Sequence, residues 1–266
     1  MLGVKHTYFL MLAVCGAGIV IDALERMTSA SKYADDGIYS WIVLRQRLVR
    51  LPAPLRGLAD RLCAGSARLQ AVLVLRIAAV ALVLVSPFEG VGYSIGLSAL
   101  VATQAYVFLR TAGFGAQGPD PMTLVICGSA WLTTVVVHGP RAARAGLWFV
   151  ALQVCLGYVV AGLAKLISAT WRSGRAIAAV LSTHTYGHPK LHELVRGRRL
   201  LSIFLCWSVM SWEATFPIVL VVPRPAVWPL LALGVLFHLS IAALMGFNGF
   251  LFAFPAAYFA ILAVRP

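Results

Sequence analysis

The sequence predicts an all-α membrane protein, a polytopic helical bundle of about eight transmembrane helices. Hydrophobic residues make up 61% of the 266 residues, against roughly half in an ordinary soluble domain, and charged residues make up only 12%. The mean hydropathy is +0.87. This composition argues against a soluble globule, a disordered chain and a disulfide-stabilised scaffold. We therefore expect one integral membrane domain over residues 1–266.

The apolar runs predict the helices in order. About 20 mostly apolar residues are needed to cross a bilayer, and Pro or Gly marks several of the boundaries. The predicted spans are residues 7–24, 68–86, 91–109, 121–138, 146–168, 200–222, 226–244 and 247–263. The last two spans meet in a tight turn near Gly246. An even number of spans places both termini on one side of the membrane.

Two connecting segments, residues 25–67 and 169–199, are too long to be simple turns. With eight spans they lie on the same side, which holds 15 of the 22 Lys and Arg, against five on the other side. The positive-inside rule places that side in the cytoplasm. Residues 41–62 mix arginines with Leu, Val and Ala, which is typical of a basic amphipathic helix lying in the membrane interface. A break is predicted at the Pro-Ala-Pro sequence of residues 52–54.

The net charge of +13 predicts a partner with negative charge. In a soluble protein such an excess would suggest nucleic acid. Here the basic residues lie beside apolar runs, and no basic stripe is interleaved with aromatic residues. We therefore expect the lipid bilayer, with its anionic headgroups, as the partner, and no nucleic acid.

Neither the cysteines nor the histidines predict a metal site. The five cysteines are odd in number and form no C-x-x-C pair, and the four within apolar runs are expected to be small buried hydrophobes. His184, His188 and His192 are spaced four apart, but a glycine and a proline interrupt the helix that would align them. We expect His238, in the seventh span, to be a hydrogen-bonded packing residue rather than a catalyst.

Two ionisable residues lie midway along predicted spans, where an isolated charge is costly. Arg76 lies in the second span and Glu213 in the sixth. Buried charges are normally paired, so we predict an ion pair between Arg76 and Glu213 that holds these helices together. Pro217 follows Glu213 by four residues and is expected to kink the sixth helix.

Lys165, near the end of the fifth span, has two open roles. It can reach the headgroups with its long side chain, or it can lie in an apolar pocket that favours the neutral amine and act as a base. The small residues Gly157, Ala161, Gly162 and Ala164 predict the close approach of a neighbouring helix. A catalytic lysine would face a cavity of several hundred Å³. The other residues expected around that cavity are Asp22, Asp35, Asp36, Gln117, Asp120, Trp171 and His184.

Five short stretches follow one another in a characteristic order. They are Ile21-Asp22-Ala-Leu, Lys32-Tyr33-Ala-Asp35-Asp36-Gly37-Ile, Tyr158-Val-Val-Ala-Gly-Leu-Ala-Lys165-Leu, Trp212-Glu213-Ala-Thr-Phe-Pro217 and Phe237-His238-Leu-Ser. Together they span nearly the whole chain. In order and spacing they resemble the horizontally transferred transmembrane (HTTM) family, whose membrane domain is shared with the vitamin K-dependent γ-carboxylases.

The resemblance implies a role for Lys165. In the γ-carboxylases, the lysine of this block is the proposed base that deprotonates vitamin K hydroquinone, so the resemblance implies a quinol such as menaquinol or vitamin K hydroquinone as cofactor. This chain departs from the enzymes in two blocks: Ala164 replaces a second lysine, and Ala116-Gln117 replaces a functional histidine. It also has no counterpart of the large soluble region that binds the substrate peptide.

Short members of this family include the membrane protein that helps to mature the sporulation-delaying peptide toxin together with a small partner protein. The resemblance therefore implies the membrane component of a quinone-using or peptide-modifying system in the bacterial plasma membrane, with a peptide substrate. The residues leave open a non-enzymatic membrane partner or chaperone of a peptide export or maturation complex. The family topology places the long segments and Lys165 on the non-cytoplasmic side, which is the reverse of the charge count.

Overall fold

All eight predicted apolar runs form helices in the computed structural model, which describes residues 3–111, 118–184 and 186–265. Every regular element in this part of the chain is helical. The eight helices are α1 (Val4–Thr28), α4 (Ser66–Val85), α5 (Val91–Arg110), α6 (Pro119–Trp131), α7 (Pro140–Ile167), α11 (Arg199–Thr215), α12 (Arg224–Met245) and α13 (Asn248–Val264). A π-helical turn, η3 (Leu132–Val136), continues α6, and a 3-10 turn, η4 (Phe216–Leu220), continues α11.

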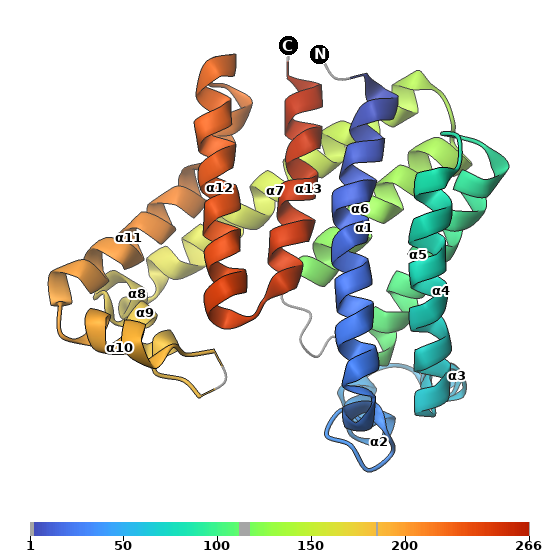
Figure 1. The fold of residues 1–266 in the computed structure, drawn as a ribbon, viewed down its shortest axis with the longest axis horizontal. Helices are drawn as coiled ribbons and strands as arrows, with labels where there is room; N and C mark the ends of the chain where they lie inside the picture. The colour runs from blue at the N-terminus through green and yellow to red at the C-terminus, as the bar shows by residue number, and fades with distance from the viewer. Residues whose placement is uncertain (1–2, 112–117, 185, 266) are drawn as a thin grey trace.

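Six of these helices are long and apolar enough to cross a membrane: α1, α4, α5, α7, α11 together with η4, and α12. They confirm an all-α, multi-pass membrane protein, whereas a count of eight spans stays a prediction. Helix α13 has only 17 residues but packs against α1, α6, α7 and α12 (Figure 1). It is apolar on all sides because it lies in the centre of the bundle, where each side faces another helix.

A glycine sets the closest approach between α7 and α11. A Cβ atom on Gly162 would lie 2.9 Å from the Cα atom of Ala214, a distance that real Cβ atoms almost never show. Only glycine lets the two backbones touch here. The close approach predicted from the small residues is therefore confirmed at Gly162.

The two long connecting segments form separate helical lobes at one end of the bundle (Figure 1). The first lobe, residues 29–65, contains η1 (Ala30–Tyr33), α2 (Trp41–Leu44), η2 (Arg45–Leu48) and α3 (Ala53–Cys63). The second lobe, residues 168–198, contains α8 (Ala169–Arg172), α9 (Arg175–Leu181) and α10 (Pro189–Arg196). The start of α1 and the end of α13 lie at the opposite end. This arrangement matches the prediction that both long segments share one side and both termini the other.

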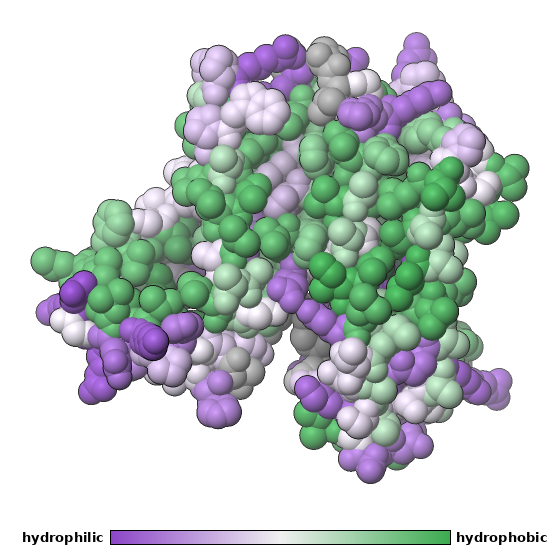
Figure 2. Space-filling view, in the orientation of Figure 1, coloured by the Kyte–Doolittle hydropathy of each residue, from purple (hydrophilic) through white to green (hydrophobic). Residues whose placement is uncertain are grey.

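The surface follows the same division. Figure 2 shows apolar side chains over the middle of the bundle and hydrophilic side chains concentrated at its two ends. A protein surrounded by lipid tails in its middle and by headgroups and water at its ends has this pattern. The same view shows the surface hollowed between the two lobes.

Candidate functional site

The predicted ion pair between Arg76 and Glu213 is wrong, because each residue binds a different partner. Arg76 donates one hydrogen bond to Asp22 Oδ2 at 2.9 Å and another to Gln104 Oε1 at 2.5 Å. Lys165 Nζ donates to the two carboxylate oxygens of Glu213 at 2.8 and 2.6 Å. The ion pairs form between neighbouring helices, because α4 packs against α1 and α11 packs against α7.

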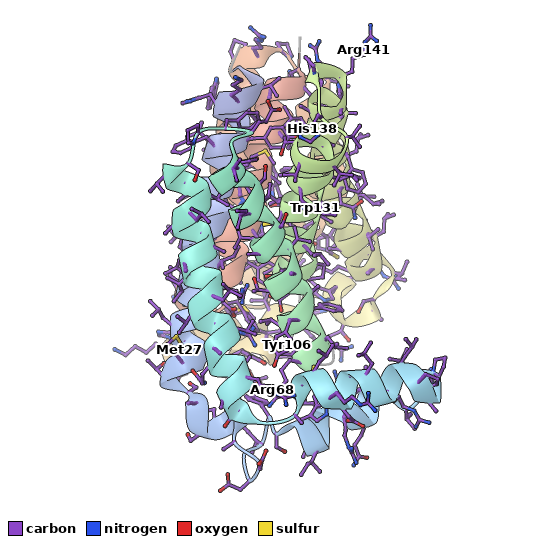
Figure 3. All side chains as sticks on the ribbon, turned by 90° about the vertical axis from the view of Figure 1, so that its right-hand side faces the viewer. Met27, Arg68, Tyr106, Trp131, His138 and Arg141 are labelled. Atoms are coloured by element: carbon purple, nitrogen blue, oxygen red, sulfur yellow. The ribbon has the colours of Figure 1, made fainter. Side chains whose placement is uncertain are left out.

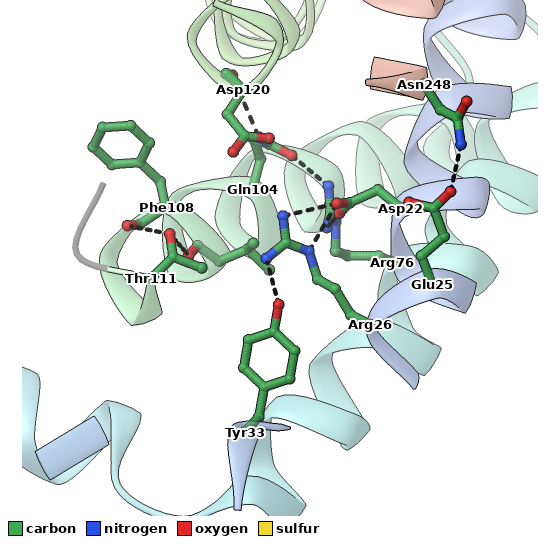
Figure 4. Close-up of polar contacts among 11 residues, drawn as sticks. Asp22, Glu25, Arg26, Tyr33, Arg76, Gln104, Phe108, Thr111, Asp120 and Asn248 are labelled. Carbon is green, nitrogen blue, oxygen red and sulfur yellow. Dashed lines mark hydrogen bonds and ion pairs between the residues drawn. The ribbon is translucent and has the colours of Figure 1, made fainter. Parts of the chain in front are cut away.

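Asp22 is the centre of a network that joins four helices (Figure 4). Besides Arg76 of α4, it accepts a hydrogen bond at 2.8 Å from Nε of Arg26, one turn further along α1, whose Nη2 atom forms an ion pair with it at 2.7 Å. Gln104 of α5 binds Arg76 and also donates to the carbonyl oxygen of Asp120 in α6, at 3.4 Å. We call these five residues the Asp22 cluster. Helix α1 continues to Thr28, past the predicted end at residue 24, and this extension holds Arg26 in the cluster.

The larger of two cavities beside Asp22 has a volume of about 350 Å³, which is within the usual range for small-molecule sites. Its wall is formed by the end of α1, by both lobes, by Thr111 after α5 and by Phe247 before α13. The lining residues are Asp22, Glu25, Arg26, Ser29, Lys32, Tyr33, Tyr39, Leu44, Thr111, Tyr186 and Phe247. Residues from both lobes therefore enclose one space at the lobed end of the bundle.

A smaller cavity of about 60 Å³ lies on the other side of Asp22 and Glu25, which line both spaces. It is also lined by Arg76 and Asp120, so it reaches the buried part of the Asp22 cluster. Glu25 is held by Asn248 Nδ2, which donates to its carboxylate at 2.6 Å. Two carboxylates thus stand between the larger cavity and the buried arginine.

Aromatic rings form two sides of the larger cavity. The rings of Tyr33 and Tyr39 lie 5.5 Å apart in the first lobe, and those of Tyr186 and Phe247 lie 4.7 Å apart across the other wall. Arg26 Nη1 donates to Tyr33 Oη at 3.3 Å. Burial raises the pKa of the Tyr33 phenol more than the nearby Arg26 cation lowers it. Tyr33 is therefore a neutral phenol at neutral pH, able to donate and accept hydrogen bonds.

Lys165 lines neither cavity, contrary to the prediction for a catalytic base. Its ammonium group lies between the Glu213 carboxylate and the ring of Trp171, whose centroid is 5.3 Å away. Trp171, which was expected beside a cavity in front of Lys165, lines neither cavity and lies over the ammonium group instead. Glu213, the partner of Lys165, is only 6% exposed in its side chain. A lysine held at such distances by a carboxylate is part of a charge-assisted pair rather than a free amine.

The prediction that His238 is a packing residue is confirmed. His238 is buried, and its Nε2 atom lies 2.5 Å from the Tyr158 hydroxyl, which also contacts the hydroxyl of Tyr258. The Tyr158 ring stacks on Phe216, with ring centroids 3.9 Å apart. These residues join α7, α11 through η4, α12 and α13 in the core.

The remaining predicted site residues are not brought together. Asp35 and Asp36 follow η1 and His184 follows α9; all three are exposed and line neither cavity. Gln117 lies outside the described residues. The five cysteines are buried and form no disulfide, and no group of three or more His, Cys, Asp or Glu in the described part of the chain is placed to bind a metal ion.

Arg110 is a further functional candidate that the sequence reasoning missed. Its side chain is buried at the end of α5 and donates to the carbonyl oxygens of Tyr39 and Tyr33, at 3.1 and 3.2 Å. It thereby fixes the part of the first lobe that lines the larger cavity. The sequence did not indicate this role, because an arginine at the end of an apolar run is common in membrane proteins.

Comparison of the chain with protein-family models, with curated proteins and with solved structures finds no match. The functional argument therefore depends on the geometry of the site.

Proposed function

We propose that the chain is the ligand-binding membrane component of a quinone-using or peptide-modifying system of the bacterial plasma membrane, and that its ligand binds in the larger cavity. The observation that carries this proposal is a space of about 350 Å³ with aromatic walls, two cations and two carboxylates, at the end of a membrane bundle. Aromatic side chains together with convergent polar groups are typical of small-molecule sites.

The lining suits a planar ring with oxygen substituents. Tyr39, Tyr186 and Phe247 offer ring faces, which favour offset or edge contacts with another ring. Tyr33, Arg26 and Lys32 are the residues that would hold the oxygens of a quinone headgroup, and a bound quinol would supply two-electron redox chemistry. The volume is near the lower end for ligand sites, which favours a ring over an extended peptide.

In this proposal the groups that face the ligand are Asp22 and Glu25, rather than Lys165. Both carboxylates line the larger cavity, and a carboxylate can accept the proton of a hydroxyl group. Lys165 is separated from this space and is bound to Glu213.

Photolabelling tests the proposal. The full-length protein in proteoliposomes is irradiated with an azidoquinone that has a short isoprenoid tail, and labelled peptides are identified by mass spectrometry. We expect saturable labelling of the larger cavity, competed by unlabelled quinone. Tyr39→Ala and Tyr186→Ala each remove a ring contact and should raise the half-saturating concentration about two- to tenfold. Trp228→Ala, at the exposed start of α12, is the matched control and should change nothing. Labelling that does not saturate, or that is spread over lipid-facing helices, would contradict the proposal.

A second candidate is a non-enzymatic membrane partner or chaperone of a peptide maturation complex. The observation that favours it is the pairing of both predicted mid-span charges, Arg76 with Asp22 and Glu213 with Lys165. Such pairs hold helices together without any chemistry. This candidate predicts no saturable quinone labelling, and it predicts that a small protein co-purifies with the chain from its native membrane.

A further inference from the structure

The first lobe exposes many large apolar side chains next to the bundle. Val49 is 64% exposed and Leu58 is 53% exposed. The other exposed apolar residues of this lobe between residues 41 and 63 are Ile42, Val43, Leu51, Leu55 and Leu62. In water such a continuous apolar surface would be costly, and it marks a site of contact with a membrane or a protein.

On α3 these side chains form a single stripe. Leu55, Leu58 and Leu62 are spaced by three and four residues, which places them on one side of a helix. Ala59 and Cys63 are buried on a neighbouring side, where they pack in one cluster with Trp41. Arg56 and Asp60 lie away from the leucine stripe, and Arg61 lies at its edge, next to Leu58. No described part of the chain covers the stripe, because all three leucines are exposed.

The direction of α3 suits the surface of a membrane. In Figure 3 the light blue helix of the first lobe runs across the direction of α4, which begins just before Arg68. Gly65 forms the corner between α3 and α4 with a φ of +84°, a conformation that favours glycine. If α4 crosses the bilayer, α3 lies parallel to its surface at the level where the apolar part of α4 begins.

The positive charge of this region indicates which kind of membrane surface it would contact. Between residues 41 and 68 the chain carries six arginines, and Asp60 is its one acidic residue. The Asp60 carboxylate already has partners, since it accepts a hydrogen bond from Trp41 Nε1 at 2.8 Å and forms an ion pair with Arg45 at 3.4 Å. Arginines near a bilayer surface are attracted by anionic lipid headgroups.

We propose that residues 41–68 form a platform that binds anionic lipid. The leucine stripe of α3 enters the layer just below the headgroups, and the arginines contact the phosphates. A basic amphipathic helix with leucines on its other side binds membranes by this combination of apolar burial and charge attraction. The proposal does not depend on what the larger cavity binds.

Spin-label accessibility in proteoliposomes tests the depth of the stripe. Leu55→Cys, Leu58→Cys and Leu62→Cys carry the label, and Arg56→Cys and Gly57→Cys, exposed positions of the same helix away from the stripe, are matched controls. The unsubstituted protein, whose cysteines are buried, gives the background. In vesicles that contain phosphatidylglycerol we expect the leucine positions to be relaxed more by oxygen than by a water-soluble nickel chelate, and the control positions to show the reverse.

Two results would overturn the proposal. One is equal access of the nickel chelate to both sides of α3, which would place the helix in water. The other is strong spin–spin broadening at the leucine positions, which would place a second copy on the stripe. Lipid analysis gives an independent readout: the triple variant Arg50→Gln/Arg56→Gln/Arg61→Gln should lose phosphatidylglycerol from the purified protein several-fold. The same change at Arg141, Arg144 and Arg224, at the other end of the bundle, should not, and an equal loss in both would also overturn it.

Discussion

The Asp22 cluster and the Lys165–Glu213 pair both bury charge among apolar helices, but they are built differently. The pair joins two helices, and the ring of Trp171 lies over its cation. The cluster joins four helices, contains two arginines for the one carboxylate of Asp22 that binds them, and borders two cavities. A pair that neutralises itself has no need of a third group. The cluster, in contrast, leaves the Asp22 carboxylate at the wall of two open spaces.

Removing a charge from each of the two sites and measuring the loss of stability tests this difference. For the cluster we expect the largest effect from Arg76→Ala, because it leaves Asp22 and Gln104 without their shared partner and Arg76 is only 2% exposed in its side chain. Breaking a buried pair in this way costs about 3–5 kcal/mol. The free energy of unfolding, measured by denaturation in detergent, should fall by that amount. Arg26→Ala should cost less, because Arg76 stays bound to Asp22 and the Arg26 side chain is more exposed than that of Arg76. An equal or larger loss would show that Arg26 is the main partner.

For the pair, the informative contrast is between two replacements of the same residue. Lys165→Ala leaves the buried Glu213 carboxylate without its cation and should cost about 3 kcal/mol of stability. Lys165→Arg restores two donors to the carboxylate and should cost less than about 1 kcal/mol. Cellular function should follow stability. Loss of function in a stable Lys165→Arg protein would instead support a proton-transfer role, since the guanidinium stays protonated.

A smaller effect than the loss of either charge is expected from the backbone contact that brings the pair together. Gly162→Ala adds a methyl group against the backbone of Ala214, so α7 and α11 must separate. Overpacking of this kind costs about 1–3 kcal/mol. Gly157→Ala, on the same helix, places its methyl group 3.9 Å from Phe254 and is the matched control. A melting temperature that falls equally in both variants would mean that the loss comes from elsewhere than the α7–α11 contact.

The sequence predicted the helices well because the apolar runs are long and their ends are marked by Pro and Gly. It also placed both lobes on one side and predicted the break before α3. These results depend on local pattern and on the alternation of spans, which the chain order fixes.

The choice of ionic partners could not be predicted in the same way. A sequence indicates how deep a charge lies along a helix, but it does not indicate which helices are neighbours. Arg76 and Glu213 lie at similar positions in their spans, yet α4 packs on α1 and α11 packs on α7. Arg26 did carry a signal, because it follows Asp22 by four residues and so lies on the same side of α1.

Arg110 has a consequence for how this protein can change over evolution. It holds the first lobe through the main-chain carbonyl groups of Tyr33 and Tyr39, so the attachment does not depend on the side chains at those two positions. The same two side chains line the larger cavity. A replacement of the half-buried Tyr39 can therefore change the wall of the cavity while both backbone hydrogen bonds of Arg110 are kept. The fold thus ties the first lobe to the bundle through backbone groups, so that side chains of the cavity wall can be replaced while this attachment stays intact.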